Sequence, residues 1–360
     1  MTDAVGKKLS TMDRYLPVWI FAAMALGLGL GRTWPGIGPA LDRVKLDTVS
    51  LPIAVGLLWM MYPVLAKVKY GKLGHLTRGK LVATSLVFNW VIGPLLMFAL
   101  AWLFLPDLPH YRTGLILIGL ARCIAMVLIW NMLACGSGEL AAVLVALNSV
   151  FQIAFYSVLG WLFITVVPGW FGADVTEFHV SIGAIAKSVA IFLGVPLVAG
   201  ALTRLLLVRR RGEEWYETRF LPRIGPTALF GLLYTIVIMF AMQGDKMVAH
   251  PVDVLRIALP LVLYFAITFV SAFLVSRKLG FSYEETAALS FTAAGNNFEL
   301  AIAVAVGLFG IRSGEALAGV VGPLIEVPAL ISLVYVSLWL RERLFANVPA
   351  ARGGGGVTAR

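Results

Sequence analysis

Two short polar segments lie in the middle of long apolar stretches of this sequence, and they hold the residue types best suited to binding chemistry. The first lies in the stretch 113–135 and the second in the stretch 286–310. Their polar side chains belong to Cys123, Arg122, Asn296, Asn297 and Glu299. A thiol and two amides can hold a small polar ligand, and a buried carboxyl group can bind and release protons because burial disfavours its charged form. We expect these five residues to line one substrate pocket.

Ionisable groups at mid-membrane depth are costly, by about 3 kcal/mol or more each, so they mark functional sites. Two of these residues could instead have a purely structural role. Cys123 could be a small buried apolar residue, and Arg122 could form a structural ion pair with Glu299. Glu326 is either a proton site or a partner for Lys187. The neutral polar residues expected to form hydrogen bonds between helices are Asn89, Asn131, Asn148 and Gln152.

The composition and the apolar runs of the sequence indicate that membrane-spanning helices position these residues. Hydrophobic residues make up 60% of the 360 residues, charged residues make up 13%, and the mean hydropathy is +0.90. Apolar runs long enough to cross a bilayer recur along the chain. We predict an all-α polytopic membrane protein with ten spans, near residues 15–31, 48–66, 81–105, 113–135, 139–167, 180–208, 220–243, 252–276, 286–310 and 316–340.

The basic residues predict the orientation of these spans. Of the 29 Lys and Arg residues, 20 fall on the side that holds both termini. Basic loops stay in the cytoplasm, so both termini are expected there, in the inner or plasma membrane of the cell. The formal net charge of +10 then reflects membrane topology, and nucleic acid is not an expected partner.

Ten spans also suggest a duplication of five plus five, which places the two halves in opposite orientations. The expected repeats are residues 1–170 and 171–345, followed by a disordered cytoplasmic tail, 346–360. A shift of 178 residues overlays Asn148 on Glu326 and Cys123 on Ala301. The fourth and ninth spans become symmetry partners, and the helix-disfavouring run from Gly295 to Asn297 is expected to unwind.

The fourth, fifth and ninth spans resemble a known family. The matching segments are Gly119-Leu120-Ala121-Arg122-Cys123-Ile124-Ala125-Met126-Val127 with Trp130-Asn131, Val145-Ala146-Leu147-Asn148-Ser149 with Phe151-Gln152, and Asn296-Asn297-Phe298-Glu299-Leu300-Ala301-Ile302-Ala303. They are similar to the signature of the arsenical-resistance permeases, which are arsenite efflux transporters of the bile acid/arsenite/riboflavin transporter superfamily. The resemblance covers essentially the whole chain.

This resemblance implies an inverted-repeat fold like that of the bile acid/sodium symporters, with broken, crossing helices 4 and 9. It implies antiport of arsenite, and sometimes antimonite, against protons. The family's indispensable cysteine and glutamate fall on Cys123 and Glu299, and Glu326 is a second candidate for proton coupling. Cys123 would bind the substrate's trivalent arsenic, since thiolates suit soft centres. Met132 departs from the family pattern, which often has an acidic residue there, and Cys135 is variable.

Three other functions remain to be distinguished. The nearest is a sodium-coupled organic-anion symporter on the same fold, in which Asn296, Asn297 and Glu299 would help to coordinate sodium. The others are a membrane-embedded enzyme that uses Cys123 or Glu299, and a channel. No metal-ligand cluster, nucleophile-base spacing or Walker sequence is present in the sequence. We expect no enzymatic activity and no cofactor, and a separate ATPase subunit is not required.

Overall fold

The computed structural model of the chain describes residues 15–46, 49–67, 79–124, 126–172, 182–249, 251–310 and 313–345. These parts are almost entirely helical, apart from a short antiparallel pair of strands, β1 (Lys45–Leu46) and β2 (Val49–Ser50). The predicted disordered tail lies outside the described residues.

Helical segments coincide with every stretch that the apolar pattern predicts to span the membrane. Before residue 172 they are α3 (Leu16–Thr33), α4 (Ile37–Arg43), α5 (Leu51–Ala66), α6 (Gly79–Val87), η2 (Phe88–Ile92), α7 (Gly93–Phe104), α8 (Pro109–Leu120), α9 (Met126–Leu133), α10 (Gly138–Trp161), η3 (Leu162–Val166) and α11 (Val167–Trp170). After residue 181 they are α12 (Ile182–Val189), η5 (Ala190–Gly194), α13 (Val195–Arg211), α14 (Glu213–Trp215), η6 (Tyr216–Phe220), α15 (Leu221–Ile224), α16 (Thr227–Ala249), α17 (Pro251–Lys278), α18 (Tyr283–Ala294), α19 (Phe298–Phe309) and α20 (Gly314–Leu344).

Several of these helices are long and apolar enough to cross a bilayer. By length and composition, five qualify among the described residues: Gly79–Phe104, Gly138–Trp170, Glu213–Met242, Pro251–Lys278 and Gly314–Leu344. Shorter apolar helices are Val18–Thr33, Leu51–Pro63 and Phe298–Phe309. The chain is therefore an all-helical, multi-pass membrane protein.

Prolines inside these helices explain the wide π-helical turns η2, η3, η5 and η6. A proline lacks an N–H group, and its ring clashes with the carbonyl group four residues earlier. In each case that earlier residue lies inside the π-turn; the prolines are Pro94, Pro168, Pro196 and Pro222. The helix widens to absorb the clash and then continues.

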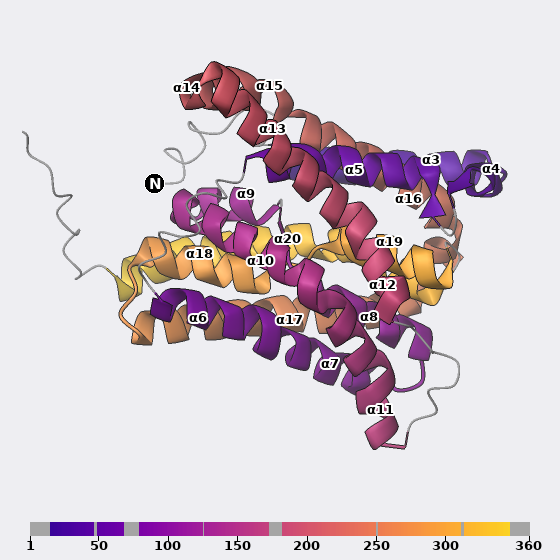
Figure 1. Cartoon of the computed structure of the whole chain (residues 1–360). Coiled ribbons are helices and arrows are strands. Elements are labelled where there is room, and N and C mark those ends of the chain that lie inside the picture. The colour runs from indigo at the N-terminus through magenta and orange to yellow at the C-terminus, as the bar shows by residue number, and fades with distance from the viewer. Residues whose placement is uncertain are drawn as a thin grey trace, which may run out of the picture.

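The helices form two packed groups, which Figure 1 shows one above the other. The first group, called the panel here, comprises α3, α5, α12, α13 and α16; within it, α16 packs on α3 and α5, and α13 packs on α5. The second group, called the core bundle, comprises α6 to α11 and α17 to α20. Contacts between the groups come mainly from α12, which packs on α10 and α19.

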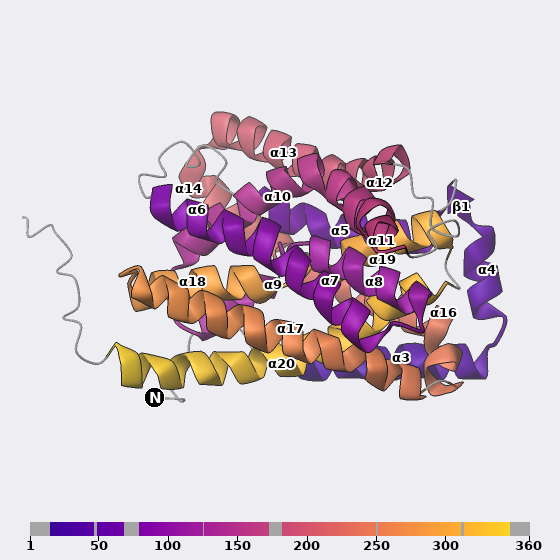
Figure 2. The same cartoon turned by 90° about the horizontal axis from the view of Figure 1, so that it is seen from below.

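Inside the core bundle, two interrupted helices cross each other. In Figures 1 and 2, α8 and α19 share one end of the bundle, whereas α9 and α18 share the other. The packing contacts agree, because α8 touches α19 and α9 touches α18. The ends of all four half-helices therefore meet near the middle of the bundle.

Close packing of α3 on α16 gives a first testable prediction, because glycines let the two backbones approach. A Cβ atom at Gly31 would lie 2.5 Å from the carbonyl oxygen of Ala241, so Gly31→Val should force the helices apart and cost about 1–3 kcal/mol. The measurement is the melting temperature of the detergent-solubilised protein. Gly29→Val is the matched control on the same helix, since nothing lies within 4 Å of a Cβ there. Equal melting of both variants would contradict this account of the panel.

Candidate functional site

Neither crossing helix is interrupted by a proline. Helix α8 ends at Leu120 and α9 begins at Met126, while α18 ends at Ala294 and α19 begins at Phe298. Ala121 and Gly295, the residues that follow the first halves, both adopt extended backbone conformations. Each helix therefore exposes backbone N–H and C=O groups in the middle of the bundle, where water cannot satisfy them.

The two extended segments satisfy much of this need by pairing with each other. Arg122 and Asn296 face each other in an antiparallel β-bridge. The N–H group of Cys123 donates to the carbonyl oxygen of Gly295 at 3.2 Å, and that of Asn297 donates to the carbonyl oxygen of Ala121 at 3.0 Å. This pairing brings four of the five predicted pocket residues into adjacent positions.

Both asparagines also stabilise helix ends through their side chains. Asn297 caps α19, its Oδ1 accepting from the N–H of Leu300 at 3.0 Å. Nδ2 of Asn296 donates to the carbonyl oxygens of Ile118 (2.8 Å) and Ala121 (3.2 Å), at the end of α8. Oδ1 of Asn296 and Nδ2 of Asn297 are buried and have no hydrogen-bond partner among the described residues. One acceptor and one donor are thus left for a ligand.

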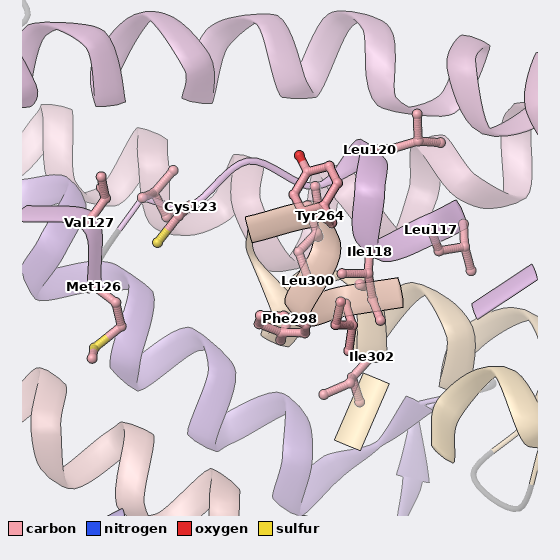
Figure 3. Close-up of a cluster of buried hydrophobic side chains, with 14 of the residues drawn as sticks. Leu117, Ile118, Leu120, Cys123, Met126, Val127, Tyr264, Phe298, Leu300 and Ile302 are labelled. Carbon is pink, nitrogen blue, oxygen red and sulfur yellow. The ribbon is translucent and has the colours of Figure 1, made fainter. Parts of the chain in front are cut away.

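The two cysteines occupy different environments. Cys123 is 3% exposed and lies against Gly295. A Cβ atom added at Gly295 would lie 2.9 Å from the Cβ atom of Cys123. Figure 3 shows its sulfur on the extended chain between the end of α8 and Met126 and Val127 of α9. Cys135, by contrast, is exposed beyond the far end of α9 with a φ of 56°. Only Cys123 belongs to the crossing.

The Arg122 side chain is completely buried, and its hydrogen-bond partners are neutral groups. Its Nη1 donates to the hydroxyl oxygen of Tyr264 at 2.8 Å and to the carbonyl oxygen of Ala293 at 3.4 Å, and its Nη2 donates to the carbonyl oxygen of Gly119. Among the described residues no carboxylate forms an ion pair with Arg122, so the ion pair with Glu299 considered above is not found.

The two glutamates are neighbours at the crossing. Glu326 is 5% exposed on α20, within electrostatic reach of Glu299 and beside the backbone N–H of Asn296, while its Oε1 has no hydrogen-bond partner. Glu299 lies in the first turn of α19 and is partly exposed. Among the described residues no ion pair joins Glu326 to Lys187. The geometry therefore favours a place for Glu326 at the crossing over a pairing with Lys187.

Hydrogen bonds from neighbouring helices hold the crossing in place. Oε1 of Gln152 on α10 accepts from the backbone N–H of Arg122, and the Tyr156 hydroxyl donates to the carbonyl oxygen of Leu117 at 2.9 Å. Trp90 donates to Oδ1 of Asn148 at 3.2 Å. The predicted contacts between helices are therefore confirmed for Asn148 and Gln152.

For the other two asparagines that prediction is wrong. Nδ2 of Asn89 bonds within its own helix, to the backbone and hydroxyl oxygens of Ser85, and the side chain of Asn131 is buried without a hydrogen-bond partner among the described residues. Tyr264 and Tyr156 were not predicted at the site. Their presence inside apolar spans was the available signal, since a buried tyrosine hydroxyl usually finds a partner.

Comparisons of the sequence with known proteins show the family of this chain. The family model described as the sodium bile acid symporter family matches residues 54–250. The arsenical-resistance protein Acr3 of Corynebacterium glutamicum is 53% identical over 349 residues, which cover 97% of this chain and 94% of that protein.

Two further relatives are similar over nearly their whole length. Acr3 of Alkaliphilus metalliredigens is 33% identical over 344 residues, covering 92% of this chain and 94% of that protein. An uncharacterized transporter of Synechocystis sp. is 36% identical over 352 residues, covering 92% of this chain and 89% of that protein. These similarities show that the chain belongs to the sodium bile acid symporter family and, within it, to the Acr3 arsenical-resistance transporters.

Proposed function

We propose that this chain exports arsenite from the cytoplasm in exchange for protons. One observation carries the proposal: a single buried thiol, that of Cys123, lies at the crossing beside two amide groups with unpaired atoms, Asn296 and Asn297. Its relatives named arsenical-resistance proteins support arsenite as the substrate. Antimonite, which has similar chemistry, is a second candidate substrate.

The chemistry of arsenite suits these groups. At neutral pH it is mostly an uncharged trihydroxide, whose arsenic favours sulfur and whose hydroxyls donate and accept hydrogen bonds. The Cys123 sulfur would hold the arsenic, while Oδ1 of Asn296 and Nδ2 of Asn297 would meet its hydroxyls. Three thiols would trap the substrate, whereas one thiol with two amides allows release. Reversible binding is what a transport cycle needs.

Proton coupling is assigned to Glu299 together with Glu326. Their charges repel each other at mid-depth, and a proton on either group relieves the repulsion. We infer that Glu299 protonated from outside and arsenite bound at Cys123 from inside exclude each other. Each proton that enters then favours release of arsenite outside, which is antiport.

The same proposal includes an inverted repeat of five plus five spans, with residues 1–170 and 171–345 as the halves and both termini in the cytoplasm. Both halves contain an interrupted helix, and each interrupted helix is followed by a long helix capped by serine, Ser137 for α10 and Ser313 for α20. The basic loops give the orientation. The two halves then form the crossing as symmetry partners.

The alternatives weaken for different reasons. A sodium-coupled organic-anion symporter would share the fold, but the 53% identity to an arsenical-resistance protein favours arsenite. The family consists of transporters, so the chain is not an enzyme. A channel is less consistent with two interrupted helices whose ends are paired and capped inside a packed bundle.

The direct test is export itself. A host that lacks its own arsenite exporter should become resistant and accumulate less arsenite when it expresses this chain. Everted membrane vesicles should take up arsenite when the lumen is acidic, and a protonophore should stop uptake whether or not sodium is present. Sodium-driven uptake of an organic anion without arsenite transport would overturn the proposal.

A further inference from the structure

Arg122 is a full positive charge buried without a carboxylate. It is 0% exposed, and among the described residues no acidic side chain lies within ion-pair distance. Burying a charge is costly unless other groups replace its water. The guanidinium contacts two backbone carbonyl oxygens, of Gly119 and Ala293, and one hydroxyl, of Tyr264. Neutral dipoles therefore stabilise Nη1 and Nη2 in place of a carboxylate, while Nε has no hydrogen-bond partner among the described residues.

The two carbonyl groups occupy equivalent positions. Gly119 is the second-last residue of α8, and Ala293 is the second-last residue of α18. The C-terminal end of each helix carries roughly half of an elementary negative charge. Two such ends together match the single positive charge of one guanidinium. In other transporters, carbonyl groups at the ends of broken helices coordinate a bound cation such as sodium.

The absence of a side chain at Gly93 leaves room for this guanidinium. A Cβ atom at Gly93, the first residue of α7, would lie 2.8 Å from Nη1 of Arg122 and 2.9 Å from the Tyr264 hydroxyl oxygen. In Figure 3 the Tyr264 hydroxyl lies beside the chain that connects Leu120 to Cys123. Atoms of α7, α17 and α18, together with the end of α8, thus lie around the Arg122 side chain.

The second half of the chain stabilises a helix end at the crossing with an uncharged side chain. Asn296 faces Arg122 in the β-bridge, and its amide donates to Ile118 and Ala121 at the end of α8. The asparagine thus caps only one interrupted helix, whereas the arginine joins the ends of both.

We propose that Arg122 is a tethered cation, which occupies the place between the ends of α8 and α18 that a bound monovalent cation would otherwise fill. It is a positioning residue: it fixes the segment that carries Cys123 and makes the crossing independent of sodium. The inference deepens the proposed exchange of arsenite for protons, because it gives a structural reason why sodium is not the coupling ion. Its removal should create a site for small cations.

The test measures melting temperatures of the purified, full-length protein in choline, sodium, potassium and guanidinium chloride, the last far below denaturing concentrations. Wild type should melt at the same temperature in all four salts. Arg122→Ala should melt lower by about 5 °C or more in choline, and sodium or guanidinium should recover at least half of that loss. Equal melting of Arg122→Ala in all salts, or stabilisation of wild type by sodium, would overturn the proposal.

A matched pair covers the case in which Arg122→Ala does not fold. Arg122→Lys keeps the charge, whereas Arg122→Gln keeps hydrogen-bond donors without it. We expect the lysine variant to melt higher and to retain more arsenite uptake, with a KM close to that of wild type. A glutamine variant as stable as the lysine variant would contradict a cationic role. Melting needs no arsenite, so this result stands apart from failure of the proposed transport activity.

Discussion

Replacing Cys123 with serine is expected to abolish arsenite export, lowering the initial rate by more than about tenfold, which corresponds to about 1.4 kcal/mol or more. A hydroxyl is a hard ligand, and trivalent arsenic prefers sulfur. The exchange alters one atom of a side chain that is 3% exposed and keeps the backbone hydrogen bond to Gly295. The measurement is arsenite uptake by everted vesicles, with the melting temperature as a check on folding.

Cys135 supplies the control within the same chain. It is exposed beyond the end of α9, outside the crossing, so Cys135→Ser should transport arsenite at the wild-type rate and confer full resistance. The reverse pattern, with activity lost at Cys135 and kept at Cys123, would show that arsenic binds beyond the end of α9 and not at the crossing. Full activity in both variants would remove the thiol from the mechanism.

The positions of the helices were predictable because the bilayer imposes a strong local signal. The stretch predicted at 139–167 is helical from Gly138 to Trp170, and the one predicted at 252–276 is helical from Pro251 to Lys278. The interruption in the second crossing helix lies at the predicted run from Gly295 to Asn297. Local composition decides each of these features.

The partners of Arg122 were not predictable in the same way. The sequence left an ion pair with Glu299 open as an alternative, but the guanidinium instead bonds Tyr264, a residue 142 positions away. This choice depends on how α17 packs against the crossing. No local pattern in the sequence contains that information.

The proposed five-plus-five repeat shows a second limit of sequence comparison. A shift of 178 residues places Cys123 on Ala301, but the β-bridge pairs position 122 with position 296, a shift of 174. Serine caps α10 and α20 at positions 137 and 313, a shift of 176. Connecting segments differ in length between the halves, so no single shift aligns them. With the proposed symmetry centred on the bridge, the counterpart of Cys123 is Asn297, which lies next to the bridge.

Replacing Glu299 with glutamine should lower the rate of arsenite transport as strongly as Cys123→Ser does, but through loss of proton coupling. Glutamine keeps the size of the side chain but resembles the protonated acid permanently. If protonated Glu299 and bound arsenite exclude each other, Glu299→Gln should bind arsenite weakly and transport it more than about tenfold more slowly. Glu326 lies close by, so Glu326→Gln should also reduce the rate, by relieving the repulsion that favours proton binding.

The dependence on pH separates this role from a loss of folding. In everted vesicles the lumen corresponds to the outside of the cell, so wild-type uptake of arsenite should rise as the lumen is acidified. Residual uptake by Glu299→Gln should not change with lumen pH, because the group that receives the proton is gone. Glu342→Gln, at an exposed position near the end of α20, should behave as wild type in both rate and pH dependence. If Glu299→Gln kept the wild-type rate and rose with acidification in the same way, the proton would have to enter through another group, and Glu326 would be the first to examine.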